Sequence, residues 1–85
     1  MIYTVEQLAP GSYDVRLNGT LVAGLVRNVH GTRPVDTWVV ELLNDMPPIK
    51  RPAPFVNQRY IFKSRSAALE WLGIPHDEDD QSQAR

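Results

Sequence analysis

The chain has 85 residues, no cysteine and a net charge of -1 at pH 7. With 42% hydrophobic and 22% charged residues, it has the composition of a small folded domain. The lack of cysteine excludes disulfides, thiolate metal sites and a cysteine nucleophile, and it favours the reducing cytoplasm. No apolar run is long enough to span a bilayer, so we expect no contact with a membrane.

Charge is distributed unevenly along the chain. Residues 1–76 carry eight basic and six acidic side chains, whereas residues 77–85 carry four acidic side chains and Arg85. The last segment also lacks large apolar side chains, so it cannot bury enough surface to fold. We therefore expect one compact domain over residues 1–76 and a disordered acidic tail over residues 77–85.

The first half of the chain predicts three antiparallel strands. Residues 1–8 alternate apolar and polar side chains loosely and residues 13–17 do so strictly, while residues 9–12 (Ala-Pro-Gly-Ser) have the composition of a turn. Asn18-Gly19 favours a two-residue type I′ turn, because both central positions of that turn need a positive φ. We expect the returning strand over residues 20–27.

A regular hairpin around this turn places Val15 opposite Val22 and Tyr13 opposite Gly24. One face of the hairpin then carries Tyr13, Val15, Leu17, Val22 and Val26, and we assign this face to the helix. The opposite face carries Leu21, Ala23 and Leu25, with Ile61 or Val39 on neighbouring strands. Contiguous apolar side chains on a face without a helix predict a contact surface, and we assign Leu21 and Leu25 to it.

The second half predicts a loop over residues 28–36 and strands over residues 37–43 and 59–62, which are rich in β-branched and aromatic residues. Between these strands, residues 44–57 contain four prolines. Proline lacks the amide that a central strand needs, so this segment is predicted to be an irregular, stiff connection.

A short helix of roughly nine residues is predicted after the last strand. Ser64 can cap its first turn, Gly73 can end it in the left-handed conformation, and Pro75 prevents its continuation. Its apolar side lies on Ala68, Leu69, Trp71 and Leu72. The predicted fold class is α+β: a small antiparallel meander of four to five strands, with one C-terminal helix packed on one face.

Catalytic chemistry is not indicated by the sequence. His30 and His76 are not spaced to pair with a nucleophile or a metal ligand, and the glycines form no phosphate-binding loop. We expect the protein not to be an enzyme, and we expect no cofactor, no bound metal and no small-molecule substrate.

Protein binding is the leading functional prediction, with a partner protein or a second copy of the chain as the ligand. Besides Leu21 and Leu25, the proline-stiffened segment offers residue types that are enriched in interfaces: Met46, Ile49, Lys50, Arg51 and Phe55. The alternative interpretation is a plain connection in which Ile49 and Phe55 close one end of the core. A chain of this size suits a stoichiometric inhibitor or partner protein carried by a phage or another mobile element.

The second functional prediction is nucleic-acid binding through a β-sheet. Basic side chains that could contact phosphates are Arg16, Lys50, Arg51, Arg59 and Lys63. The net charge of +2 over residues 1–76 is low for this class of protein.

Two resemblances in the order of elements match these two predictions. Three strands, with Tyr13-Asp-Val-Arg16 in one of them, followed by Phe62-x-Ser-x-x-Ala-Ala68 resemble the integrase arm-binding fold, which implies contact between the sheet and the major groove of DNA. Trp38-Val-Val-Glu-Leu42 followed by Ser64-x-x-x-Ala-Leu69 resembles the HicB-type antitoxin fold, which implies toxin binding. The first family has a much more basic sheet and the second a shorter Pro-Gly connection, so no residue roles are transferred from either.

Overall fold

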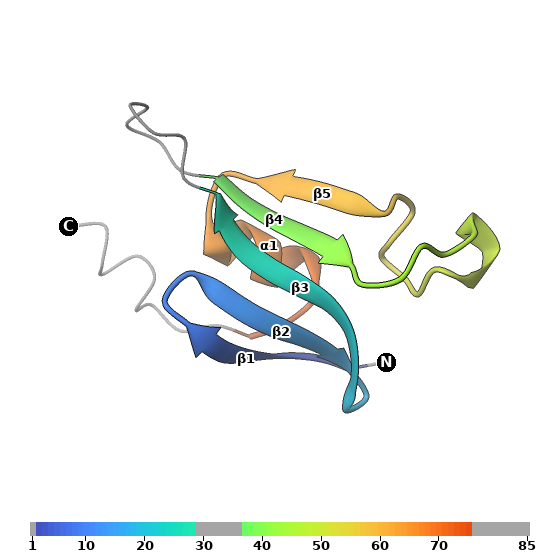
Figure 1. Ribbon diagram of the computed structural model, residues 1–85, viewed down its shortest axis with the longest axis horizontal. Coiled ribbons are helices and arrows are strands. Elements are labelled where there is room, and N and C mark those ends of the chain that lie inside the picture. The colour runs from blue at the N-terminus through green and yellow to red at the C-terminus, as the bar shows by residue number, and fades with distance from the viewer. Residues whose placement is uncertain (1, 29–36, 76–85) are drawn as a thin grey trace.

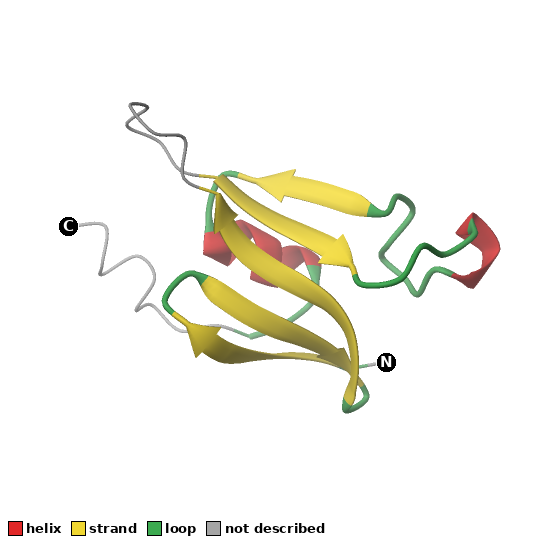
Figure 2. Cartoon of the chain, in the orientation of Figure 1, coloured by secondary structure: helices red, strands yellow, loops and turns green. Residues whose placement is uncertain are grey.

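The computed structural model describes residues 2–28 and 37–75, and these form one antiparallel sheet with a helix on one face (Figures 1 and 2). Its five strands lie side by side in chain order. In sequence, the elements are β1 (Tyr3–Ala9), β2 (Ser12–Leu17), β3 (Thr20–Asn28), β4 (Thr37–Leu42), a 3-10 turn η1 (Pro48–Lys50), β5 (Arg59–Phe62) and α1 (Arg65–Trp71). The predicted α+β fold class is confirmed. The acidic tail, both histidines and most of the predicted loop 28–36 lie outside the described residues.

The predicted turn between β2 and β3 is confirmed. Asn18 has a φ of 51° and Gly19 a φ of 87°, so both central residues are in the positive region that a type I′ turn needs. The backbone amide of Asn18 donates to the carbonyl oxygen of Ile2 at 2.8 Å, and the amide of Ile2 donates to Asn18 Oδ1 at 3.0 Å. The turn therefore also holds the residue that precedes β1.

The predicted register between β2 and β3 is wrong beyond the first pairs after the turn. Leu17 pairs with Thr20 as expected and Arg16 pairs with Leu21, but Val15 pairs with Ala23. A β-bulge at this point leaves one extra residue, Val22, in β3 and reverses the faces of all later residues of that strand.

The bulge changes which apolar residues of β3 are buried. It places Leu25 and Ala23 under the helix, where both are fully buried, and turns Val26 to the other face, where it is 46% exposed. Leu25 is thus a core residue, and its predicted position on the contact surface is wrong.

Both predicted ends of the helix are confirmed. Ser64 has extended backbone angles and its hydroxyl oxygen accepts a hydrogen bond from the amide of Ala67 at 3.1 Å. At the other end, Gly73 has a φ of +74° and its amide donates to Glu70, while the amide of Ile74 donates to Leu69. These two bonds form a Schellman motif. The helix has seven residues, slightly fewer than predicted.

The core lies between the sheet and α1. It contains the predicted helix residues Ala68, Leu69 and Leu72, and it receives side chains from β1, β2, β3 and β4 and from the loop before β5. The guanidinium of Arg65 lies over the ring of Tyr13 at 5.3 Å from the ring centre, so the start of the helix is also held against β2. The buried core members are Tyr3, Val15, Ala23, Leu25, Val40, Leu42, Phe55, Ala68, Leu69 and Leu72.

Candidate protein-contact surfaces

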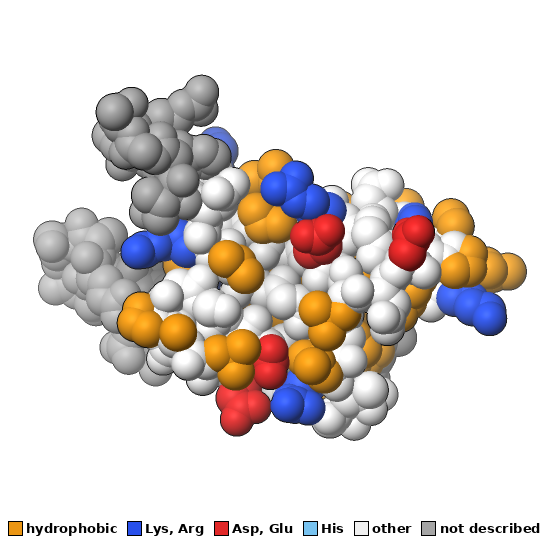
Figure 3. Space-filling model, in the orientation of Figure 1, with side chains coloured by type: hydrophobic (Ala, Val, Ile, Leu, Met, Phe, Trp, Pro, Cys, Tyr) orange, Lys and Arg blue, Asp and Glu red, His pale blue; other side chains and the backbone are white. Residues whose placement is uncertain are grey.

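The face of the sheet opposite α1 is uncovered within the described residues, and it faces the reader in Figure 3. Its β1–β2 half is charged: Arg16 Nε lies 3.6 Å from a Glu6 carboxylate oxygen, and Arg16 Nη2 lies 3.8 Å from an Asp14 carboxylate oxygen. Its β3–β5 half is mainly apolar. The two halves therefore offer different surfaces to a partner.

The apolar half is built by the strand register. Val26 of β3 pairs with Val39 of β4, and Val39 pairs with Ile61 of β5, so these side chains form a row across three strands. Val39 is only 8% exposed because it lies between the other two, whereas Ile61 is 59% exposed. Leu43 follows the end of β4 and is 55% exposed. We call Val26, Val39, Leu43 and Ile61 the open-face patch.

A depression of about 530 Å³ lies in this half of the sheet, and three residues of the open-face patch, Val26, Val39 and Leu43, form part of its lining. Gly24 forms part of it, and a Cβ atom built on Gly24 would meet nothing closer than the carbonyl oxygen of Tyr13 at 4.0 Å. The backbone of Gly24 is not in the left-handed region, so the fold itself does not require glycine there. A glycine within a strand often marks a place where another group approaches the backbone closely. The lining residues of this Gly24 depression are Gly24, Val26, Asn28, Val39, Glu41, Leu43 and Arg59.

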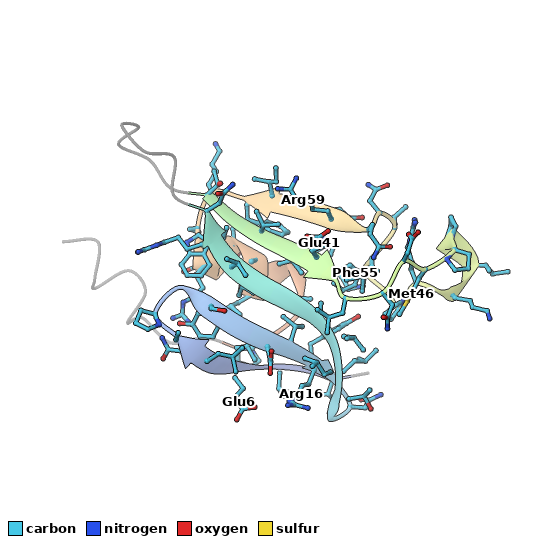
Figure 4. All side chains as sticks on the ribbon, viewed as in Figure 1. Glu6, Arg16, Glu41, Met46, Phe55 and Arg59 are labelled. Atoms are coloured by element: carbon cyan, nitrogen blue, oxygen red, sulfur yellow. The ribbon has the colours of Figure 1, made fainter. Side chains whose placement is uncertain are left out.

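Opposite charges line one side of the depression. Glu41 pairs with Gly24 on one side and with Arg59 on the other in the strand register, and Figure 4 shows the two charged side chains on adjacent strands. Cross-strand neighbours of opposite charge attract each other, which helps to orient both side chains. The depression therefore combines apolar walls with one carboxylate and one guanidinium.

The Pro-rich loop, residues 44–57, extends beyond the ends of β4 and β5 and has a defined structure (Figure 1). Phe55 is 3% exposed and packs into the core. The Tyr60 hydroxyl oxygen accepts hydrogen bonds from the amides of Val56 and Asn57, each at 2.9 Å. The side chain of Gln58 bonds to the backbone of Leu42, Asn44 and Met46. The loop is thus held at both of its ends.

The Tyr3 hydroxyl makes a further contact with this loop. It donates a hydrogen bond to the carbonyl oxygen of Ala53 at 2.6 Å. Burial of Tyr3 raises the pKa of its hydroxyl above the ordinary value of about 10, because the charged form would lose its hydration. The hydroxyl therefore stays protonated and remains a donor throughout the physiological pH range.

The predicted protein-binding residues occupy two different environments. Leu25 and Phe55 are in the core, so neither is available to a partner, and Met46 is half-buried against the core. Leu21 is 39% exposed on the open face, because it pairs with Arg16 before the register shift. Ile49 is 92% exposed and does not close the core, whereas Phe55 does. Lys50 is exposed and Arg51 is half-buried in the loop.

The basic residues of the nucleic-acid prediction are not brought together. Arg16 lies on β2 between two carboxylates, and Arg59 lies three strands away on β5, about 14 Å at the usual strand spacing. Lys50 and Arg51 are in the Pro-rich loop, and Lys63 follows β5. These residues do not form one basic surface, and the prediction of nucleic-acid binding gains no geometric support.

The sequence reasoning missed the Gly24 depression. The available signal was a lone glycine in a strand whose other residues are mostly apolar, but the wrong register placed Gly24 beneath the helix beside Tyr13. The suggestion that Val39 and Ile61 lie on the helix-free face is confirmed by the strand register.

Other kinds of site have little support among residues 2–28 and 37–75. No three histidine, aspartate or glutamate side chains in these ranges cluster to hold a metal ion. Within the same ranges, no helix has the length and hydrophobicity needed to cross a bilayer.

Comparison with known proteins adds no activity to these surfaces. No family model matches the chain, and searches of curated proteins and of solved structures also found no match. The resemblances to the integrase arm-binding and HicB-type folds stay predictions.

Proposed function

We propose that the chain is a non-enzymatic protein-binding module that contacts its partner through the open-face patch and the Gly24 depression. The observation that carries this proposal is Gly24 itself. Its backbone does not need glycine and the space above it is open. The lack of a side chain at this position therefore shapes the surface of the sheet and is not needed for the fold. Two exposed apolar side chains of the patch, Val26 and Leu43, line an opening that fits a side chain from another protein.

A protein partner fits this surface better than a nucleic acid does. Glu41 lies beside Arg59 in the depression, so an approaching phosphate would meet a carboxylate as well as a guanidinium. A protein can match both signs of charge and the apolar wall between them. The patch is also the most apolar part of the open face, which is the property expected at the centre of an interface.

The small size of the chain suits a protein that acts by occupying a binding site on its target. We propose a stoichiometric inhibitor or partner protein working in the cytoplasm, which the absence of cysteine supports. Origin from a phage or another mobile element is part of the same proposal. A second copy of the chain is the other protein that the patch could bind.

The variant Gly24→Val tests the proposal, because its side chain would enter the depression, and a Cβ atom at this position meets nothing closer than 4.0 Å. Valine also has a higher β-propensity than glycine, by up to about 1 kcal/mol, so we expect the variant to be at least as stable as the original chain. Thr4→Val is the matched control, since Thr4 is an exposed residue on β1, outside the lining of the depression. Loss of binding without loss of stability would then be due to the filled depression.

The experiment begins with affinity purification from nuclease-treated lysate of the source cells, followed by calorimetric titration of the purified partner. We expect Gly24→Val to weaken binding by about tenfold or more, which corresponds to the loss of one buried apolar side chain. Thr4→Val should bind within about threefold of the original chain. Light scattering of both variants tests a second copy as the partner.

Two outcomes contradict the proposal. One is a monomeric chain that retains no protein from the lysate. The other is a partner that binds Gly24→Val as tightly as the original chain. If retention instead depends on nucleic acid and weakens steeply with added salt, the chain belongs to the nucleic-acid-binding class.

A further inference from the structure

The far end of the Pro-rich loop combines full exposure with a defined conformation. Ile49 is the most exposed of the large hydrophobic residues in the described part of the chain, at 92%. It lies in the 3-10 turn η1, where the amide of Lys50 donates to the carbonyl oxygen of Pro47 at 2.9 Å. The amide of Arg51 donates to Pro48 at 3.3 Å. We call residues 47–50 the loop tip.

Two limbs hold this tip away from the sheet. On the returning limb, Phe55 is buried in the core and the Tyr60 hydroxyl oxygen binds the amides of the next two residues. The guanidinium of Arg51 donates to the carbonyl oxygen of Val56, which braces the returning limb against itself. On the outgoing limb, the side chain of Gln58 bonds to the backbone of Asn44 and Met46. Pro47 and Pro48 further restrict the backbone of the tip itself. An isolated exposed isoleucine is common on protein surfaces, but this one lies on a segment whose conformation is already set.

We propose that the loop tip inserts into a concave site on the partner protein, with Ile49 in an apolar pocket and carboxylates of the partner around Lys50 and Arg51. This inference rests on the proposed function, since it describes a second contact with the same partner. A preformed turn loses little conformational entropy on binding, so the contact energy of Ile49 is retained as affinity. A protruding apolar residue fits a hollow rather than a flat surface.

The charge of the loop indicates which residues surround the pocket on the partner. Lys50 is adjacent to Ile49 and exposed, and the hydrogen bond to Val56 keeps the positive charge of Arg51 near the base of the tip. Asp45 is the only acidic residue in residues 44–57, so the loop is net positive. A rim of aspartate and glutamate on the partner would match this charge and speed association.

The test uses the full-length chain with a photo-crosslinking amino acid in place of Ile49. The control chain carries it in place of Leu8, which is 61% exposed on β1. Both chains are irradiated in lysate of the source cells, and the linked peptide of the partner is sequenced. We expect one protein to link at position 49 and not at position 8, through a residue in an apolar hollow flanked by carboxylates.

The purified partner is then titrated with three variants. Ile49→Asp should weaken binding by about thirtyfold, the effect of removing a central interface anchor, with an unchanged melting temperature. Lys50→Glu should weaken binding several-fold, by an amount that decreases at high salt, whereas Lys50→Arg should bind normally. Together, the three variants distinguish a contact made by an apolar anchor from a contact that depends only on the charge of the loop.

The outcomes distinguish this inference from the proposed function. If Gly24→Val loses binding and Ile49→Asp does not, the open-face proposal stands and the loop-tip inference is wrong. If only Ile49→Asp loses binding, the loop tip is the main contact and the open-face proposal is wrong. If no protein links at position 49, the inference is wrong. It is also wrong if the original chain sediments with phosphatidylglycerol vesicles and Ile49→Asp does not, since the tip would then bind lipid.

Discussion

The ring of Phe55 meets the ring of Trp71 edge to face, with the ring centres 5.0 Å apart and the planes at 80°. Phe55 belongs to the Pro-rich loop and Trp71 to α1, so this contact joins the loop to the helix. Phe55 also lies against Tyr3 and Tyr60, with ring centres 6.2 Å apart in each pair. The base of the loop is therefore part of the hydrophobic core.

Replacing Phe55 by alanine should be strongly destabilising. The variant loses these ring contacts and leaves a cavity, so we expect the free energy of unfolding to fall by about 3–5 kcal/mol. Val56→Ala is the control, because Val56 is 71% exposed and its truncation should change the free energy by less than about 0.5 kcal/mol. Urea unfolding followed by tryptophan fluorescence measures both. Equal stability of the two variants would show that the loop does not contribute to the core.

Removing the Tyr60 hydroxyl should loosen the loop without unfolding the domain. Tyr60→Phe keeps the ring contact with Trp71 but removes the acceptor for the amides of Val56 and Asn57. We expect a loss of about 0.5–1.5 kcal/mol, together with faster hydrogen exchange at these two amides. At the amide of Val15, in the middle of β2, hydrogen exchange should become faster only by the amount that the lower stability of the whole domain accounts for. Unchanged exchange at the two loop amides would contradict the role assigned to Tyr60.

The stability of the domain should decrease at alkaline pH in a way that depends on Tyr3. Its pKa is raised by burial, so above about pH 10 the unfolded chain loses the proton before the folded chain does. The contribution of Tyr3 is therefore complete below about pH 10 and is lost as the pH rises further. Denaturant titrations between about pH 8 and 11 should show a steeper decline for the original chain than for Tyr3→Phe. Parallel declines in both chains would contradict the pKa shift.

Two leucines of the same strand should respond very differently to truncation. Leu25 is fully buried and Leu21 is 39% exposed, because the β-bulge lies between them. We expect Leu25→Ala to cost about 2–5 kcal/mol and Leu21→Ala less than about 1 kcal/mol. Thermal unfolding monitored by circular dichroism measures the difference. Similar losses at both positions would favour the regular hairpin and contradict the bulge.

The sequence predicted those parts of the fold that are decided locally. Asn18-Gly19 requires positive φ at two adjacent residues, and Ser64 and Gly73 each complete hydrogen bonds within a few residues. These choices do not depend on distant contacts, and all of them were predicted correctly. The order of β1, β2 and β3 was predictable in the same way, because short turns join these three strands.

The register of β3 could not be predicted in the same way. Whether Leu25 or Val26 faces inward depends on the total apolar area buried against α1 and β4, which are distant in sequence. Phe55 poses the same problem, because its position in the core depends on Tyr3, Tyr60 and Trp71. The candidate site was mispredicted for this reason: the two residues wrongly assigned to it are buried by long-range contacts.

The loop tip owes its position to its two limbs and to Phe55 behind them. The side chain of Ile49 takes no part in the core and is almost fully exposed. The amino acids at the tip can therefore change without altering the sheet, the helix or the anchoring aromatic ring. Such a domain is a scaffold on which binding specificity can diverge faster than structure, and exchanging a few residues at the tip is a direct route to redirecting it toward a new target.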